Sequence, residues 1–485
     1  MPPTEPMEHR SQSTPRRRVL LWILLGAGLL LAAAAAIVIV TVFDEDALRD
    51  RFHATASAAL GLEVAIDGPM DLAIWPTPNI SAADIVLEKD GAPIARFDAV
   101  RLDIALLPLL TGNLRIRHVN VDGADVELRR DAAGQLNFQG PERGEVQARD
   151  VPAASFSAIS LSYADEGEEA RLHASGCGGR LSSLAIAEDG GKTALGNLRG
   201  KGTLHCAVIE AQEFRFTNVE FALSAREGLL RLEPISLRLF DGDGSGRVEG
   251  DFSGDLPLWS LHLELEDFAL EEFLRTLEPE ARAEGSMYFR AELSARGNHR
   301  EALERSLAGN VSLGGETLTL HGGDLDQRLA DYEATQQFGL LDAGALFFAG
   351  PAGLVVTRGH EFAQLLRGDD GKTEFREVRS EWTVSEGVAE AADVAAATAR
   401  NRLAARGRID YAARGFDEFT VLLLDRQGCV VMEQSVHGSF EDPQIEEPGT
   451  IETVLGPLIE LVERGLAELV DDDCEVVYDG AVAHP

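Results

Sequence analysis

The chain has 485 residues, and its 81 acidic against 44 basic side chains give a formal net charge of −37. Such an acidic surface repels phosphate backbones and anionic headgroups, which argues against a nucleic-acid-binding protein. Hydrophobic residues make up 45% of the chain, enough for a sizeable core and ordinarily for two or three domains.

An uncharged apolar run near the N-terminus predicts a membrane anchor. The run from Val19 to Phe43 would span roughly 37 Å as a helix, more than the ~30 Å hydrocarbon core. Arg16, Arg17 and Arg18 precede it, so the N-terminus is expected in the cytoplasm and the bulk of the chain outside. A cleaved signal peptide is the alternative, but its apolar region would measure only about 7–15 residues. The residues that we expect within the span include Val19, Trp22, Leu31, Val40 and Phe43.

From Leu62 onward, apolar residues recur at every second position, which predicts strands with one apolar and one polar face. Helical spacing is confined to 44–61, 270–277, a short segment that begins at Leu325, and 451–470. We therefore predict a mainly β fold with a few short helices. A single N-terminal transmembrane helix would precede an elongated, curled antiparallel β-sheet shaped like a trough.

The sequence divides into six regions. They are a cytoplasmic N-terminus (1–18), the transmembrane anchor (19–43), an N-terminal β region (44–150), a central β region (151–305), a C-terminal β region (306–445), and an amphipathic helix with the tail (446–485). No proline-rich linker separates independent domains, so one continuous sheet is favoured.

Helical material is too scarce to cover the apolar face of such a sheet. The sheet must therefore fold into a sandwich, in which its apolar side chains pack on one another, or curl around an apolar ligand. An acyl chain, at about 0.8 kcal/mol per buried methylene, is a sufficient occupant. We expect the trough to be lined by Leu102, Ile104, Phe221, Leu223, Leu237, Leu239, Leu261, Leu263 and Leu265.

The four cysteines, Cys177, Cys206, Cys429 and Cys474, form no C-x-x-C motif, which argues against the usual zinc and thioredoxin-like sites. In an oxidising compartment their even number suggests two disulfides. Among the three connectivities we favour the local one, Cys177 with Cys206 and Cys429 with Cys474, on loop length. Isolated buried thiols are the alternative.

No motif supports catalysis, a cofactor or a metal. The DGDGSG run at Asp241–Gly246 begins like a calcium loop, but Phe252 stands where an EF-hand needs glutamate. A glycine-rich turn is the better interpretation. The histidines are scattered, and nucleotide-binding, zinc-protease and hydrolase signatures do not occur. We therefore expect a protein that is not an enzyme.

Several stretches, taken in order, resemble the AsmA family. Within residues 61–138, the family-like elements are Gly68, the Trp75-Pro76 corner, Leu107-Pro108-Leu109-Leu110 with Gly112, Ile116, Val119, Val121, Gly134 and Asn137. Residues 307–329 and 375–410 are similar to the second half of the family, and 428–444 resembles the closing part of a subgroup. Gly123-Ala124 departs from the proline that is common there, which should affect only a turn.

The resemblance implies an inner-membrane-anchored periplasmic protein of a Gram-negative bacterium, tied to outer-membrane biogenesis. Larger relatives are grouped with bridge-like lipid transfer proteins, whose sheet curls into an apolar trough. Membrane phospholipids are then the expected partners, alongside a periplasmic or outer-membrane protein. At about 4.8 Å per strand the sheet would extend on the order of 100–120 Å, so we do not expect one copy to join both membranes.

Three functions remain open from the sequence. The first is the binding or transfer of phospholipid along the trough. The second is a structural or assembly factor for outer-membrane proteins, which acts through protein contacts and carries no lipid. A periplasmic hydrolase, the third, requires a convergent polar pocket that the sequence does not reveal.

Overall fold

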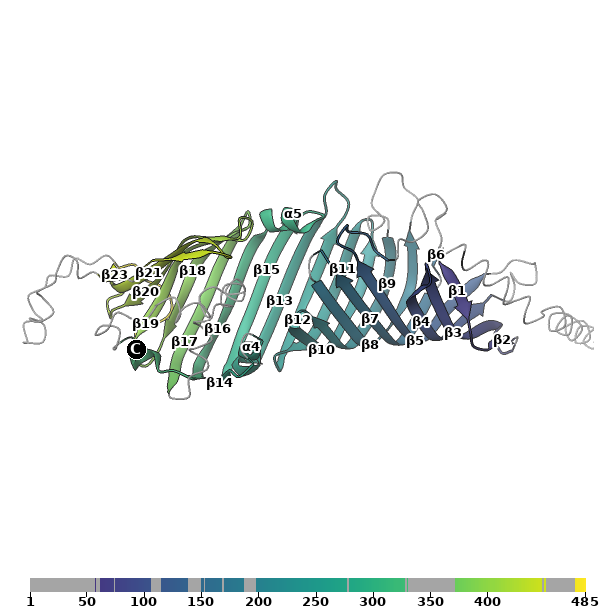
Figure 1. Cartoon of the computed structure of the whole chain (residues 1–485), viewed down its shortest axis with the longest axis horizontal. Coiled ribbons are helices and arrows are strands. Elements are labelled where there is room, and N and C mark those ends of the chain that lie inside the picture. Colours follow the sequence, from purple (N-terminus) through teal and green to yellow (C-terminus); the bar gives the residue numbers. More distant parts are fainter. Residues whose placement is uncertain are drawn as a thin grey trace, which may run out of the picture. The chain divides into compact units, whose positions relative to one another are not determined.

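A computed structural model gives the fold of the chain (Figure 1). It describes residues 57, 62–73, 75–105, 115–137, 150–151, 153–167, 170–186, 198–276, 279–327, 329, 371–446, 449–450 and 476–485. The predicted anchor with its preceding arginines, and the predicted helix at 451–470, lie outside these residues. None of the helices within the described ranges has the length and apolar character needed to span a bilayer.

The described residues are mainly β-structure and divide into two compact units. Unit 1 comprises residues 1–119 and 140–142, and unit 2 comprises 120–139 and 143–485. The strands that lie in unit 1 are β1 (Glu63–Ile66), β2 (Met70–Ala73), β3 (Asn79–Lys89) and β4 (Ala92–Ile104), and β5 (Ile116–Arg130) crosses the division.

Unit 2 holds the remaining strands and two short helices, α4 (Leu270–Arg275) and α5 (Arg300–Arg305). Its strands are β6 (Asp150–Val151), β7 (Ala153–Asp165), β8 (Ala170–Ile186), β9 (Leu198–Ala211), β10 (Phe214–Arg226), β11 (Leu229–Leu239), β12 (Gly242–Asp251), β13 (Leu258–Ala269), β14 (Arg282–Glu284), β15 (Ser286–Arg296), β16 (Ala308–His321), β17 (Lys372–Ser385), β18 (Val388–Ala397), β19 (Arg402–Asp410), β20 (Gly415–Leu424), β21 (Val430–Ser439), β22 (Pro443–Ile445) and β23 (Gly449–Thr450). The predicted mainly β fold with a few short helices is confirmed.

In unit 1, β3 is the central strand. It pairs antiparallel with β1 and β2 along one edge and with β4 along the other. Because apolar residues alternate along these strands, one face collects them into a small core. The buried members of that core are Val64, Ile66, Met70, Ile80, Ala82, Ile85 and Ile104.

Unit 2 is an antiparallel meander in which each long strand pairs with its neighbours along the chain (Figure 1). The order from β7 to β13 is unbroken, and β15 to β21 continue it after the short β14. The helix α4 interrupts the meander after β13. Its Leu270, Phe273 and Leu274 are buried, and it occupies most of the segment predicted as helical at 270–277.

Local irregularities bend this meander. Left-handed backbone at Ala158, Asn218, Asp267, Gly407 and Glu418 coincides with shifts of pairing register. Such bulges increase the local bend and twist of a sheet. The sheet of unit 2 is accordingly curled rather than flat.

The curl is tightest towards the C-terminal strands. Trp382 on β17 stacks on Phe419 of β20 with ring centroids 6.1 Å apart, although β18 and β19 lie between the two strands. Three strand spacings in a flat sheet would put their backbones about 14 Å apart. The apolar face here closes on itself into a dry core. Fully enclosed members of this core are Leu318, Val378, Val394, Leu403, Ile409 and Val421.

The opposite face of β18–β20 is also covered, by the C-terminal tail. Val482 is fully buried there against alanines and leucines of these strands. Tyr478 donates a hydrogen bond to the Asp393 carboxylate (2.6 Å) and accepts one from the Val482 amide (3.1 Å). Burial and the adjacent Asp393 raise the pKa of Tyr478 well above its ordinary value. The tail therefore covers this part of the sheet. The Tyr478 phenol is neutral at physiological pH.

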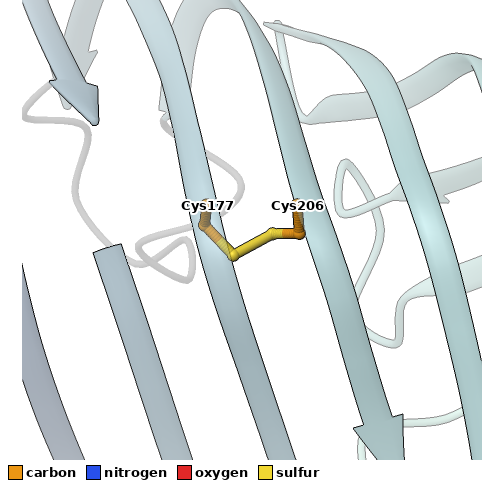
Figure 2. The surroundings of a disulfide bond; sticks show 2 residues. All are labelled: Cys177 and Cys206. Carbon is orange, nitrogen blue, oxygen red and sulfur yellow. A yellow bond between two sulfur atoms is a disulfide. The ribbon is translucent and has the colours of Figure 1, made fainter. Parts of the chain in front are cut away.

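A disulfide joins Cys177 on β8 to Cys206 on β9, two directly neighbouring strands (Figure 2). Their Cα atoms are 3.9 Å apart. Cys206 pairs with Val219 of β10, so the bond lies on the apolar side of the sheet. Cys429 is also disulfide-bonded. Its predicted partner, Cys474, lies outside the described residues.

The dry core yields a stability prediction. Replacing the fully buried Leu318 by alanine should cost about 2–5 kcal/mol, because the shortened side chain leaves a cavity in a closed environment. The matched control is Leu256→Ala, since Leu256 is 44% exposed in a loop and should change stability by no more than about 0.5 kcal/mol. Urea unfolding followed by tryptophan fluorescence measures both. Equal midpoints for the two variants would contradict a dry core.

The disulfide arrangement yields a second prediction. Peptide mass mapping without reduction should recover Cys177 linked to Cys206 and Cys429 linked to Cys474. The double replacement Cys177→Ser and Cys206→Ser should lower the free energy of unfolding by about 2–4 kcal/mol, because the unfolded chain loses a cross-link. Recovery of Cys177 as a free thiol from protein purified without reductant would rule the arrangement out.

Candidate functional site

Strand register arranges the apolar side chains of unit 2 into continuous rows on one face, which we call the inner face. Residues that pair directly across an antiparallel ladder lie on the same side of the sheet. One row runs through Phe156, Gly179, Leu204, Phe221, Ile235, Gly246, Leu263, Ala291, Val311 and Trp382. A neighbouring row runs through Leu181, Gly202, Leu223, Leu232, Val248, Leu261, Leu293, Gly309 and Val384.

The burial of the inner face changes along the meander. From β15 to β21 it is the dry core, which also takes in Leu265 and Phe268 at the end of β13, whereas from β8 to β13 most of its other large side chains remain half-buried. We call this second stretch the open face. Its half-buried members are Leu181, Leu204, Phe221, Leu223, Leu232, Ile235, Leu237, Leu261 and Leu263. A contiguous apolar surface of this kind marks a binding site more often than a solvated face.

Strand β12 forms the floor of the open face. Its Gly242, Gly244 and Gly246 alternate on the inner side, between leucine-bearing positions of β11 and β13. A Cβ atom on Gly244 would lie 2.5 Å from the Leu237 side chain, and one on Gly246 would lie 2.4 Å from a backbone oxygen. Larger residues do not fit at these two positions. The glycines therefore form a shallow floor between the neighbouring leucine side chains.

These glycines belong to the DGDGSG run that sequence analysis interpreted as a turn. Only its first residue, Asp241, lies in the turn, and the rest belongs to β12. The missed signal was the period of two, which places three glycines on the face that carries leucines in the adjoining strands.

Within the described ranges, no group of acidic, histidine and cysteine side chains could hold a metal.

A cluster of five aromatic rings borders one end of the open face. Phe240 contacts Phe214, Phe268 and Phe273 at centroid distances of 6.1, 5.9 and 5.5 Å, and Phe214 also neighbours Phe216 (6.4 Å). We call these five residues the phenylalanine cluster. It joins β10, the turn between β11 and β12, the end of β13, and α4, so this side of the open face ends against packed rings rather than solvent.

The nine predicted trough residues fall into three environments. Phe221, Leu223, Leu237, Leu261 and Leu263 share the open face. Leu265 is buried in the dry core, against which Leu239 packs at its margin. Leu102 and Ile104 belong to unit 1, where Ile104 is 4% exposed within the core and Leu102 pairs with Ile80.

Polar side chains of unit 2 gather where β5, β7 and β8 lie together. A polar cavity of about 1210 Å³ lies at the ends of β5, β7 and β8. In it the buried Asp165 accepts hydrogen bonds from Tyr163 (3.0 Å) and Arg130 (3.1 Å), and burial together with Asp165 raises the pKa of Tyr163. Ser162 and His173 also meet there at 3.0 Å. The acidic lining makes this cavity unsuited to acyl chains.

Comparisons with known proteins place the chain in a family. The AsmA family pattern matches residues 14–165 and 204–394. Protein AsmA of Escherichia coli (strain K12) is 30% identical over 138 residues, which make up 28% of this chain and 19% of that protein. No solved structure matches the chain. Since the family pattern covers more than half of the sequence, the protein belongs to the AsmA family.

Proposed function

We propose that the protein binds phospholipid acyl chains on the open face of unit 2 and passes them outward from the inner membrane during outer-membrane biogenesis. The observation that supports this most is the set of half-buried apolar side chains across β8–β13, which share one face and are interrupted there by glycines. A surface of this kind, placed opposite a polar outer face, matches the amphipathic character of a lipid.

Energetics favour a flexible hydrocarbon as the occupant. Each methylene removed from water contributes about 0.8 kcal/mol, so a bound acyl chain recovers much of the solvation cost of the exposed leucines. A glycine floor with leucine walls makes few directional demands on its ligand. The site therefore suits chains of varied length and unsaturation better than a rigid small molecule.

The dry core limits how lipid can travel. Between β15 and β21 the inner face is filled by the protein's own side chains, including Trp382 and Phe419. In our proposal lipid therefore occupies the open face and leaves unit 2 before the dry core, instead of running the full length of the meander. Membrane anchoring through residues 19–43 would hold the open face close to its lipid supply.

A role as an assembly factor that acts through protein contacts is the second candidate. It is favoured by Val431 and Ile445, which are 40% and 55% exposed near the last strands of the meander. β22 and β23 are short and cover only part of β21. In either case we propose binding rather than catalysis as the function.

A charge placed on the open face should separate the two functions. Leu237→Asp buries a carboxylate against acyl chains and should lower the amount of co-purifying phospholipid at least about tenfold, since an unpaired buried charge costs several kcal/mol. The matched control is Ser236→Asp, which adds the same charge to the same strand on the exposed outer face.

Lipid content is measured by mass spectrometry of the full-length protein released in detergent. The proposed function predicts bound phospholipid in the wild type and in Ser236→Asp but not in Leu237→Asp. Wild-type protein free of lipid, with both variants still supporting outer-membrane integrity in cells, would favour the assembly factor instead.

A further inference from the structure

Trp75, in the turn between β2 and β3, is 87% exposed, more than any other large hydrophobic side chain that the structure describes. The turn is held in place, because the Ile104 amide donates a hydrogen bond to the Pro78 carbonyl (2.8 Å). The Asn79 side chain donates another to the Thr77 carbonyl (3.0 Å). A large ring that stays in water gives up the free energy of burial, so its exposure on a held turn indicates a partner.

A second exposed apolar side chain lies at the same end of unit 1. Ala105, which follows β4, donates a hydrogen bond from its amide to the Arg115 carbonyl (2.8 Å), and Ile116 at the start of β5 is 36% exposed. The sequence between Ala105 and Arg115 contains five leucines and no charged residue, and it lies outside the described residues. We call Trp75 and Ile116 the apolar tip of unit 1.

Charge is distributed unevenly along unit 1. Five charged side chains lie level with the first three residues of β3 or at the start of β5, with a net charge of +1: Arg101, Arg115 and Arg117 against Asp71 and Asp103. The rest of the stretch 62–119 has a net charge of −4: Lys89 and Arg96 against Glu63, Asp67, Asp84, Glu88, Asp90 and Asp98. An anionic membrane surface therefore repels the apolar tip less than it repels the other end of unit 1.

The predicted anchor keeps unit 1 close to the bilayer. It ends at Phe43, and the Val64 amide at the start of the sheet donates a hydrogen bond to the Ser57 hydroxyl (3.2 Å). The 13 residues between Phe43 and Ser57 span at most about 45 Å. From Glu63 to Ala73, β1 and β2 together extend about 35 Å. Either end of unit 1 can therefore reach the membrane, and side-chain chemistry selects between them.

We propose that the apolar tip of unit 1 docks on the surface of the inner membrane, with the Trp75 ring inserted among the phospholipid headgroups. An indole combines a large apolar ring with one N–H donor, which suits the boundary between hydrocarbon and headgroups. A second point of attachment beside the anchor would fix which end of unit 1 faces the bilayer. This inference rests on the predicted anchor and goes beyond the proposed function, which concerns lipid on unit 2.

Brominated phospholipids, which quench nearby indoles, test the proposal. The full-length protein is placed in vesicles of phosphatidylethanolamine and phosphatidylglycerol, with bromine near the headgroup end of the acyl chains. The Trp75 signal is the difference in emission between the wild type and Trp75→Phe. Brominated lipid should reduce this signal at least about twofold, because an indole at the interface lies within reach of the bromine atoms.

The matched control moves the indole to the opposite end of unit 1. Ala92 is exposed at the hairpin between β3 and β4, so Trp75→Phe with Ala92→Trp places a ring there. Brominated lipid should leave the emission of that ring unchanged, whereas acrylamide in the water should quench it. Because the Trp75 side chain is 87% exposed, Trp75→Phe should keep the wild-type midpoint of urea unfolding, which separates lost docking from misfolding.

The outcomes separate this proposal from the proposed function. A Trp75 signal that brominated lipid leaves unchanged, or equal quenching of the rings at positions 75 and 92, would overturn membrane docking. Leu237→Asp, which should remove lipid from the open face, should leave the quenching of Trp75 as it is. Quenching that disappears in Leu237→Asp would assign the effect to lipid carried by the protein, and the docking proposal would fail while lipid binding stands.

Discussion

A sheet that is apolar on one side and has no second layer among the described residues must bury that side in another way, and this constraint shapes unit 2. Two solutions are available to a curled meander: it can tighten until its own side chains meet, or it can leave the face for something else. Unit 2 adopts the first between β15 and β21 and the second between β8 and β13. The binding surface that we propose lies where one solution gives way to the other.

Side-chain size decides which solution applies. Trp382 and Phe419 are large enough to reach across two intervening strands, and the buried side chains of the short helix α4 belong to the same core. In β12 three successive inward positions, Gly242, Gly244 and Gly246, are glycines, which have no side chain to bridge any distance. The leucines on either side of β12 therefore have no opposing wall of comparable bulk. The same backbone pattern thus gives a core in one stretch and a surface in the other.

The period-two alternation predicted the strands, and it placed residues such as Leu237 and Leu263 on one face correctly because side-chain direction follows from position within a strand. It could not separate the enclosed Leu265 from its half-buried neighbour Leu263, since that depends on curvature set by bulges such as Asp267. Nor could it show that Ile104 belongs to unit 1 and not to unit 2, because the division into units depends on contacts between residues far apart in the sequence. The glycines of β12 were visible in the sequence but were interpreted through a calcium motif instead of their period.

The meander has one further consequence, for how such proteins change in length over evolution. From β8 to β13, each long strand of unit 2 pairs with its neighbours in the chain. In repeat architectures of this kind a module can be gained or lost without repacking the others. A duplicated hairpin would lengthen the sheet by about 10 Å. The length of the sheet can therefore be adjusted by insertion, with no new fold required.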